Sequence, residues 1–545
     1  MTFLRHITAL LACFMFATSI QAVQIRREPG HRIPESILPT DRDNPALWTP
    51  ERSYIYTRGA APGDYAINDI PRTGTIHYPL VLVQFPDLKF TVDDTDALLG
   101  YYRNLFNEDG YNDTEGFNYR GVRYYRSTAS VSDYFRDQSY GQYIPRFDII
   151  GPITVSKGYA YYGEGDDDNV QELVLEICDS IITHNLANLS GYARNGIIDQ
   201  LSLVYAGRGE NYYGSDPNTI WPHASFISTA RRDTTIYQSG IIRIKYSCSC
   251  ELFWDTDSIP DGIGTFCHEF SHTLGLPDFY NTDYSDSDKS QKDDEDNAAM
   301  GFWSLMDYGC YDNQGFSPVG YTAFEKYSLG WLDLEEITYQ GSYDLNVISQ
   351  RPDPEAGIHS AYRLNTGNDN QFIILENHAK SGWYSQHKAE GLMVTAVDYN
   401  ISGWTGNYVN NYNPKHYRIL PADNDYKRNT NAGDLFPYTY TDSEGTHVVD
   451  SITTKGEPEL KAGTSYPTFS IYNITRNGNL ITFKAGYDMP SGIGNVKPDE
   501  TTVTVYDISG KPVLKTTTSD PEHISLPGPG IWIIKYGNKT RKVRL

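Results

Sequence analysis

One short stretch of this chain constrains its structure more than any other, and it contains His268, His272, Gly275, Pro277 and Asp278. Side chains four residues apart lie on one face of an α-helix, so His268 and His272 can offer two imidazoles to one metal ion. Gly275 is the residue type expected where a helix ends in a left-handed turn, and Pro277 prevents the helix from continuing. The chain must turn sharply there, which brings Asp278 back as a third, oxygen ligand.

The spacing of these residues predicts a hydrolytic zinc site. Two imidazoles and a carboxylate bind Zn²⁺ and leave a fourth position for water, and Glu269 stands beside them as a general base. A surface helix can carry His-Glu-x-x-His by chance, but the glycine and the aspartate at the right offsets argue against that interpretation. Residues 303–309 add a second element, which looks like the methionine turn beneath the metal in metzincin peptidases.

These elements and much of the flanking chain resemble the immune inhibitor A family of secreted metzincin zinc metallopeptidases. The resemblance runs from about residue 78 to about residue 488. Besides the two elements already described, the shared segments are residues 130–135, 139–141, 220–223, 325–331 and 372–377.

The resemblance implies roles for individual side chains. Asp278 falls where the family has its third metal ligand, and Met306 would form an apolar floor below the ion instead of binding it. Tyr308 matches the position of a tyrosine that contacts the metal or the oxyanion in some metzincins, although the wider family varies there. Ala396 stands where the family commonly has a histidine, so any role of that histidine is lost in this chain.

The length and charge of the chain limit what it can be. A chain of 545 residues is too long for one hydrophobic core, and we expect two to four domains. The net charge of −24 argues against binding to nucleic acid, which requires a basic face. Beyond the N-terminal region no apolar run is long enough to cross a membrane, so we expect a soluble protein without a transmembrane segment.

The N-terminal region has the pattern of a targeting segment. Residues 1–22 read as a signal peptide, with cleavage expected after Ala22. Cys13 lies in a sequence that resembles a lipoprotein box, but apolar residues continue beyond it, so lipidation is the weaker alternative. Residues 23–77 are interpreted as an N-terminal segment or a propeptide that would make the protein a zymogen. Residues 62–64 loosely resemble a metzincin propeptide element, although a plain Gly-Asp turn explains them more simply.

Residues 78–335 are expected to form the catalytic domain, with an α/β (α+β) fold that contains a mixed, twisted sheet and the zinc-binding helix. The expected strands are residues 78–85, 201–206 and 241–246, and the expected helices begin near Ser130 and Asn169. His223 allows two interpretations. It lines the substrate cleft, as the resemblance suggests, or it is an ordinary structural histidine, which we favour.

Removal of the signal peptide leaves five cysteines, an odd number, so at least one is unpaired. They are Cys178, Cys248, Cys250, Cys267 and Cys310. The last two adjoin the zinc motif and the methionine turn, and either a bridge between them or two buried thiols fits the sequence. The acidic residues 283–296 most simply form a solvated loop. They also offer carboxylates to Ca²⁺, but no spacing among them matches a known calcium loop.

The pattern changes in the last third of the chain. Residues 336–489 contain short alternating runs and are expected to form a β-rich region packed on the catalytic domain. Residues 490–496 read as a linker, and residues 497–545 as a small β-sandwich. This last segment resembles the C-terminal sorting domain of the type IX (Por) secretion system. That resemblance implies export through the periplasm of a Gram-negative bacterium, then release or anchoring at the outer surface. The alternative is an ordinary terminal β-sandwich for binding.

The sequence as a whole therefore predicts a secreted zinc endopeptidase that hydrolyses peptide bonds in proteins. The alternative is a cell-surface binding protein or adhesin whose peptidase domain is secondary or inactive. The intact Glu269 between His268 and His272 argues against that alternative, because a protein that only binds has no use for a general base.

Overall fold

The computed structural model of the chain divides into two compact units, residues 1–487 and residues 488–545, which are described separately. The residues whose structure is described are 70–112, 116–124, 129–164, 169–213, 218–228, 235–254, 256–282, 299–412, 414–426, 432–488, 501–518, 524, 526–528, 530–536 and 539–544. The expected signal peptide, residues 62–64, the acidic residues 283–296 and the expected linker lie outside this set.

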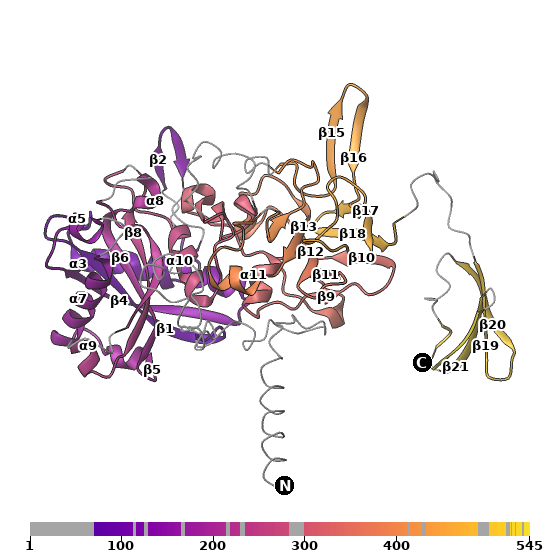
Figure 1. Ribbon diagram of the computed structural model, residues 1–545, viewed down its shortest axis with the longest axis horizontal. Coiled ribbons are helices and arrows are strands. Elements are labelled where there is room, and N and C mark those ends of the chain that lie inside the picture. The colour runs from indigo at the N-terminus through magenta and orange to yellow at the C-terminus, as the bar shows by residue number, and fades with distance from the viewer. Residues whose placement is uncertain are drawn as a thin grey trace, which may run out of the picture. The chain divides into compact units, whose positions relative to one another are not determined.

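A six-stranded sheet lies at the centre of the N-terminal half of the first unit (Figure 1). Its strands are β1 Gly74–Gln84, β4 Tyr143–Thr154, β5 Ala193–Arg194, β6 Ile197–Arg208, β7 His223–Ser228 and β8 Arg243–Leu252. The order is β4-β1-β6-β8-β7, and β5 pairs with β6. The first four strands in this order run parallel, whereas β7 runs antiparallel to β8 at one edge. The sheet is therefore mixed, as the sequence predicts.

The strands lie close to their predicted places, with one shift. Residues 78–85 and 201–206 fall almost wholly within β1 and β6. The predicted strand at 241–246 is displaced, because β8 begins only at Arg243. Gly240 turns the chain with a φ of +87°, and the backbone N–H of the second residue after it donates to the carbonyl of Gly196 across that turn, at 2.7 Å. The run of apolar residues alone did not show that the turn ends, and the strand begins, only at Arg243.

Helices cover both faces of the sheet. They are α3 Thr95–Asn107, α4 Val131–Gln138, α5 Tyr159–Tyr162, α7 Val170–Thr183, α8 Glu210–Tyr213, α9 Thr235–Gln238, α10 Gly264–Leu274 and α11 Ala323–Ser328. Successive side chains of a strand point to opposite faces. Leu80 and Leu82 of β1 accordingly pack in a cluster with α3, α4 and α10, whereas Val81 and Val83 pack in a second cluster with α7. None of the helices described is long and apolar enough to span a membrane.

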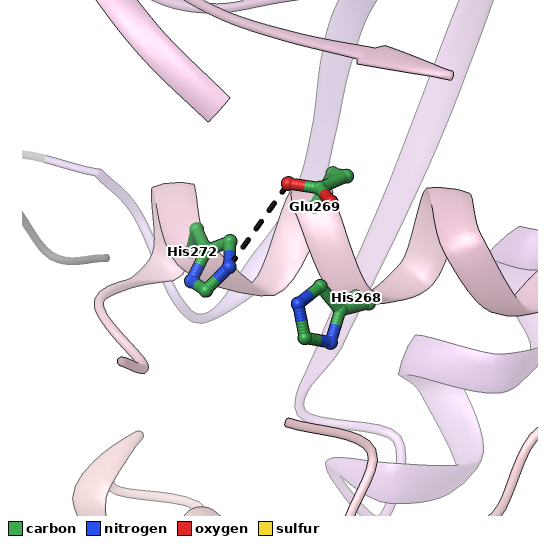
Figure 2. A group of neighbouring side chains, drawn as sticks. All are labelled: His268, Glu269 and His272. Carbon is green, nitrogen blue, oxygen red and sulfur yellow. Dashed lines mark ion pairs between the residues drawn. The ribbon is translucent and has the colours of Figure 1, made fainter. Parts of the chain in front are cut away.

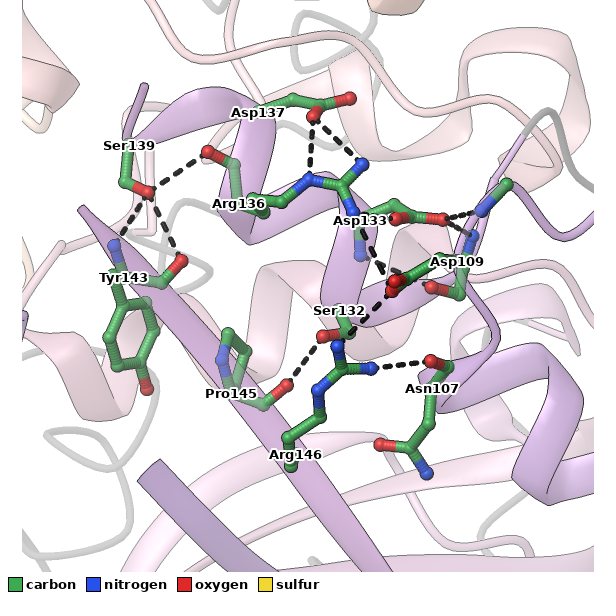
Figure 3. Close-up of polar contacts among 12 residues, drawn as sticks. Asn107, Asp109, Ser132, Asp133, Arg136, Asp137, Ser139, Tyr143, Pro145 and Arg146 are labelled. Atoms are coloured by element: carbon green, nitrogen blue, oxygen red, sulfur yellow. Dashed lines mark hydrogen bonds and ion pairs between the residues drawn. The ribbon is translucent and has the colours of Figure 1, made fainter. Parts of the chain in front are cut away.

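Helix α4 shows how local sequence and tertiary contacts fix one element (Figure 3). It begins where predicted, because Ser130 and Asp133 form a reciprocal capping box. The hydroxyl of Ser132 donates to the carbonyl of Pro145 on β4, at 2.7 Å. Arg136 pairs with the fully buried carboxylate of Asp133 at 2.5 Å. These contacts hold α4 against the edge of the sheet, where it supports the core beneath α10.

The rest of the first unit is rich in β-structure. Its strands are β9 Glu335–Glu336, β10 Gly341–Leu345, β11 Ala361–Asn365, β12 Gln371–His378, β13 Gly391–Asp398, β14 Tyr417–Ile419, β15 Tyr438–Asp442, β16 Gly445–Val449, β17 Ser470–Asn477 and β18 Leu480–Gly486. They form a five-stranded sheet in the order β14-β13-β12-β11-β9, a three-stranded sheet β10-β18-β17, and the separate hairpin β15-β16.

The five-stranded sheet connects the two halves of this unit. On β12, Ile373 and Leu375 pack in a cluster with residues of the three-stranded sheet. Phe372 and Ile374 point the other way and join the cluster that contains α10. Because both faces of β12 are buried, the β-rich region shares a hydrophobic core with the region that carries the predicted zinc site.

The described residues of the second unit form one antiparallel sheet with the order β20-β19-β21-β22. These strands are β19 Thr501–Tyr506, β20 Pro512–Thr518, β21 Ile531–Tyr536 and β22 Lys539–Arg544. Its core consists of Val503, Val505, Ile534 and Tyr536. The sequence predicts a small sandwich here, whereas the part of this unit that the structure describes forms a single four-stranded sheet.

Candidate metal centre

Helix α10 carries the predicted site, and its two ends are fixed by backbone geometry. At the start, a Cβ on Gly264 would lie 1.9 Å from the carbonyl oxygen of Cys310, so only glycine allows this close approach. At the end, Gly275 adopts the left-handed conformation with a φ of +109°, as predicted. The backbone N–H of Leu276 then donates to the carbonyl of Ser271 at 3.2 Å, which closes the turn. The chain after this turn comes back toward the helix.

Three side-chain atoms converge beside the helix. The Oδ1 atom of Asp278 lies 3.0 Å from Nε2 of His268 and 3.3 Å from Nε2 of His272. The rings of the two histidines lie on the same side of α10 (Figure 2). Glu269 lies at the edge of the group, with Oε2 4.0 Å from Nε2 of His272. All four side chains are buried, with exposed fractions of 7%, 3%, 6% and 0% for His268, His272, Glu269 and Asp278.

Backbone carbonyls set the orientation of both imidazoles. Nδ1 of His268 lies 2.9 Å from the carbonyl oxygen of Leu305, and Nδ1 of His272 lies 2.8 Å from that of Leu276. A carbonyl can only accept, so each Nδ1 carries the proton and each Nε2 has its lone pair free to bind a metal. Such outer contacts are typical of metal-binding histidines. Leu305 immediately precedes Met306, and this contact therefore connects the predicted methionine turn to the first ligand.

Asp278 is oriented by a residue far away in the sequence. Asn407 donates from Nδ2 to Oδ2 of Asp278 at 2.7 Å, and its Oδ1 accepts from the backbone N–H of Asp278, also at 2.7 Å. Asn407 follows the short helix α12 (Ile401–Thr405) in the β-rich region. Trp404 of that helix donates from its indole nitrogen to the carbonyl of Gly275 at 3.2 Å. The β-rich region thus holds the turn and the third carboxylate in place, a role that the sequence did not reveal.

The electrostatics of the site follow from this proximity. Burial by itself would raise the pKa of Asp278, but the nearness of the imidazoles of His272 and His268 outweighs burial and holds this pKa well below its ordinary value. Burial lowers the pKa of His272, which favours its neutral, metal-binding form. A carboxylate that stays ionised beside a neutral imidazole is the protonation state in which such side chains bind a cation.

The donor set fits a zinc ion. Nε2 of His272 and Oδ1 of Asp278 are buried atoms without a hydrogen-bond partner among the described residues. A buried polar atom without a partner is destabilising, so both point to a missing group at the place where the three donors meet. Two nitrogen donors and one oxygen donor with a neighbouring carboxylate are the ligand chemistry of catalytic zinc sites. Calcium, which prefers oxygen ligands only, does not fit this set.

The predicted methionine turn lies directly under this group. Met306 is fully buried, and its carbonyl accepts from the backbone N–H of Phe279, at 2.7 Å. Its own N–H donates to the hydroxyl of Ser304 at 3.0 Å, and that hydroxyl donates to Glu325 at 2.6 Å. Tyr308 lies nearby, with its ring 6.4 Å and 6.2 Å from the rings of Tyr280 and Phe302. The turn therefore supports both the first ligand and the segment that follows the third.

Glu325 fixes the methionine turn by accepting a hydrogen bond from Ser304. It is fully buried, and it caps α11 together with Thr322 while it accepts the hydrogen bond from Ser304. Burial raises the pKa of Glu325 to about 7. Next to it, the ammonium of Lys326 donates to the carbonyl of Gln138 at 2.8 Å and lies 4.5 Å from the centre of the Tyr140 ring. The sequence placed both residues in a segment shared with the family but did not show what they hold.

Two interpretations that the sequence left open can now be compared with the structure. His223 is 3% exposed, with Nε2 2.9 Å from the hydroxyl of Tyr246 and Nδ1 2.7 Å from the carbonyl of Trp221. These contacts support the structural role that we favoured. Cys267 and Cys310, like the other three cysteines among the described residues, are buried and form no disulfide.

Comparison with known proteins shows what part of the chain is similar to. Residues 76–334 match the family model described as immune inhibitor A peptidase M6, catalytic domain. The matched residues contain the whole of the candidate metal centre except Asn407. This region is therefore similar to a peptidase catalytic domain, and one of the relatives described next is named a metalloprotease.

Individual relatives are similar at a lower level. The chain is 25% identical over 327 residues to the pre-pro-metalloprotease PrtV of Vibrio cholerae serotype O1, a match that covers 52% of this chain and 33% of the relative. It is 24% identical over 307 residues to immune inhibitor A of Bacillus thuringiensis subsp. alesti, which covers 48% of this chain and 41% of the relative. The chain thus spans between a third and about two fifths of the length of these curated relatives.

Proposed function

We propose that this chain is a secreted, zinc-dependent endopeptidase that hydrolyses peptide bonds in proteins. The convergence of Nε2 of His268, Nε2 of His272 and Oδ1 of Asp278 is the observation that carries the proposal. These three side chains would hold one Zn²⁺ ion. When bound, Zn²⁺ supplies Lewis acidity, which makes water a nucleophile at neutral pH and polarises a carbonyl group.

Glu269 is the general base in this proposal. Its Oε2 atom lies 4.0 Å from the Nε2 atom of His272, and we assign this carboxylate to the base because Asp278 supplies the oxygen ligand. Oε2 would accept a proton from the attacking water and then deliver it to the nitrogen of the leaving amine. Burial of this carboxylate keeps bulk water from competing for that proton, because only 6% of the residue is exposed.

The other residues position these groups. The carbonyls of Leu276 and Leu305 fix the tautomer of each histidine, and Asn407 fixes the third carboxylate. We assign Met306 to the apolar floor, consistent with its complete burial. Tyr308 would contact the oxyanion of the substrate. Support for this role is limited to its place two residues after Met306 and to its partial exposure.

The second unit would serve export and not catalysis. Its described strands form a separate sheet with its own small core. Together with the sequence resemblance, this supports a sorting domain that is read by the type IX secretion machinery. Under this proposal the chain crosses the periplasm of a Gram-negative bacterium and acts on protein substrates at or beyond the cell surface.

The direct test is the Glu269→Ala variant. It should keep about one equivalent of zinc and the melting temperature of the parent while hydrolysis of unfolded casein falls by a factor on the order of a thousand or more. Zinc content and casein hydrolysis also separate an endopeptidase from the alternative, a cell-surface binding protein with an inactive domain. A parent protein that binds zinc but cleaves no peptide in a library would favour the alternative. A Glu269→Ala variant that loses its zinc would make Glu269 a ligand instead of a base.

A further inference from the structure

A second group of buried histidines lies in the β-rich region, outside the site described above. Glu376 and His378 are two residues apart on β12 and therefore on one face of the strand. His387 follows η9 (Gly382–Tyr384), the short helix after that strand. The exposed fractions of these three residues are 0%, 0% and 6%. The ring of Trp303 packs 5.5 Å from that of His378 and 4.4 Å from that of His387.

The polar atoms of this group are unsatisfied. None of the four ring nitrogens of His378 and His387 has a hydrogen-bond partner among the described residues. The same holds for Oε1 of Glu376, while its Oε2 accepts from the backbone N–H of Ala323 at 2.5 Å. Leaving a buried polar atom without a partner destabilises the folded chain. So many unsatisfied atoms in one place indicate that a further group completes the cluster.

The charge balance around the cluster favours a cation. Glu376, Glu325 and Asp434 are all buried. Lys326 is the basic residue next to Glu325, but burial lowers its pKa to about 7, and its side-chain nitrogen donates to Gln138 at 2.8 Å and 3.1 Å. Burial raises the pKa of both Glu325 and Asp434 to about 7. Burial makes the ionised form of these carboxylates unfavourable, and a bound dication would oppose that effect.

The distances suit one ion between the rings. The ring centres of His378 and His387 are 5.3 Å apart, compared with 4.7 Å for His268 and His272. Two imidazoles bound tetrahedrally at a metal–nitrogen distance of 2.0–2.1 Å have their centres about 5 Å apart. Nε2 of His378 lies 3.6 Å from Oε2 of Glu376, a separation that two ligands of one ion can have.

We propose that His378 and His387, with Glu376 as a third donor, bind a second divalent transition metal ion of the zinc type. Imidazole nitrogen with a carboxylate is a donor set that zinc-like ions accept and that calcium and magnesium do not favour. Burial holds the pKa of His387 well below its ordinary value, which keeps the ring in the neutral form that binds metals. His387 also lines a cavity of about 400 Å³, which gives an ion a route to the cluster.

The donor atoms of this second site are not yet arranged to bind one ion, unlike those of the first site. In the part of the chain that the structure describes, the donor atoms of His268, Glu269 and His272 all lie within 4.8 Å of one another, whereas those of Glu376, His378 and His387 do not. A side chain of the second cluster must therefore rotate to bring its third donor to the ion. The second ion should bind more weakly than the first and be the first to leave when a chelator is added.

The test counts metal ions in the full chain. The parent, dialysed against Zn²⁺ or Co²⁺ and freed of excess metal, should hold two equivalents, and a weak chelator should remove one of them. His387→Ala should hold one. His387→Gln should also hold one, and it guards against misfolding because its amide can still form hydrogen bonds. The matched control is His416→Ala, which removes another histidine of the same region and should leave two equivalents. His416 has an unsatisfied Nδ1 but lies outside the cluster.

Removal of the first site distinguishes the two ions. In a His272→Ala background, Co²⁺ should still bind at one equivalent and give the visible absorption of a nitrogen-ligated ion, and adding His387→Ala should abolish it. One equivalent in the parent would overturn the proposal. So would two equivalents in a folded His387→Ala variant, and either result would leave water molecules as the partners of these rings. Neither result affects the expected loss of hydrolysis in Glu269→Ala. The second metal site is therefore tested independently of the proposed function.

Discussion

Asn407 holds Asp278 with two hydrogen bonds of 2.7 Å, one to the carboxylate and one from the backbone N–H, although 129 positions separate the two residues. The first bond leaves Oδ1 of Asp278 as the atom that faces the two histidines. The second fixes the backbone at the point where the chain returns from the end of α10. The region that follows residues 76–334 therefore contributes structurally to the candidate metal centre.

Asn407→Ala should weaken zinc binding by about 10–100-fold, because an outer-shell partner of a metal ligand is lost while the ligand itself remains. Competition with a graded series of chelators measures the change. Asn411→Ala is the matched control, since Asn411 lies in the same loop and accepts from the backbone N–H of Thr282 at 2.8 Å without touching a ligand. Equal zinc affinity in the two variants would show that Asn407 has no special role.

Asp278→Ala should reduce zinc affinity further than Asn407→Ala does, because two histidines alone leave two ligand positions open. We expect a loss on the order of a thousand-fold or more. Asp278→His should recover part of it if the turn at Gly275 can place the longer side chain. Zinc retained at the parent's affinity by Asp278→Ala would mean that another residue is the third ligand.

Gly275→Ala should destabilise the protein by about 1–2 kcal/mol, since an L-residue is strained at the left-handed φ of +109° found there. It should also weaken zinc binding, because Leu276, whose carbonyl orients His272, follows directly. Thermal unfolding and chelator competition check both effects. Gly100→Ala in α3 serves as the control. A Cβ there meets nothing within 4 Å, and the change should be neutral or slightly stabilising.

Asp434 should make stability depend on pH. Burial raises its pKa from 3.8 to about 7, against a smaller opposing effect of the hydrogen bond from Trp303. Between these values the folded chain keeps a proton that the unfolded chain has released. The free energy of unfolding therefore falls as pH rises through this window, by at most about 1.4 kcal/mol per pH unit for this group.

The Asp434→Asn variant isolates that effect, because its amide oxygen can still accept from the indole of Trp303. Urea unfolding of parent and variant at pH 5 and pH 8, both in excess chelator, gives the comparison. At pH 8 the free energy of unfolding of the variant should exceed that of the parent. At pH 5 this difference should be smaller. A difference that is the same at both values would contradict a raised pKa at Asp434.

Removal of the second unit should leave catalysis intact. A chain that ends at Tyr487 contains the metal centre, the β-rich region and their shared core. Its zinc content, casein hydrolysis and melting temperature should match those of the full chain. In a host with type IX secretion, the shortened chain should accumulate in the periplasm. If the shortened chain still reached the cell surface normally, the second unit would not be a sorting domain.

The sequence by itself was enough to name four side chains that the structure brings together at the candidate site. A helix brings residues four apart onto one face, and a glycine followed by a proline ends it, so His268, Glu269, His272 and Asp278 could be named from local rules alone. The same local rules located α4, α7 and three of the six strands of the central sheet. They placed β8 two residues too early, because the turn at Gly240 depends on a contact with Gly196.

The tertiary structure decided everything that depends on residues distant in sequence. Asn407, the carbonyl of Leu305 and the buried Glu325 acquire their roles only when separate strands and loops pack together, and no spacing along the chain records such contacts. The cluster of Glu376, His378 and His387 is visible only in the fold for the same reason. Burial is what makes an unsatisfied ring nitrogen significant, and burial is a property of the packed chain and not of the sequence.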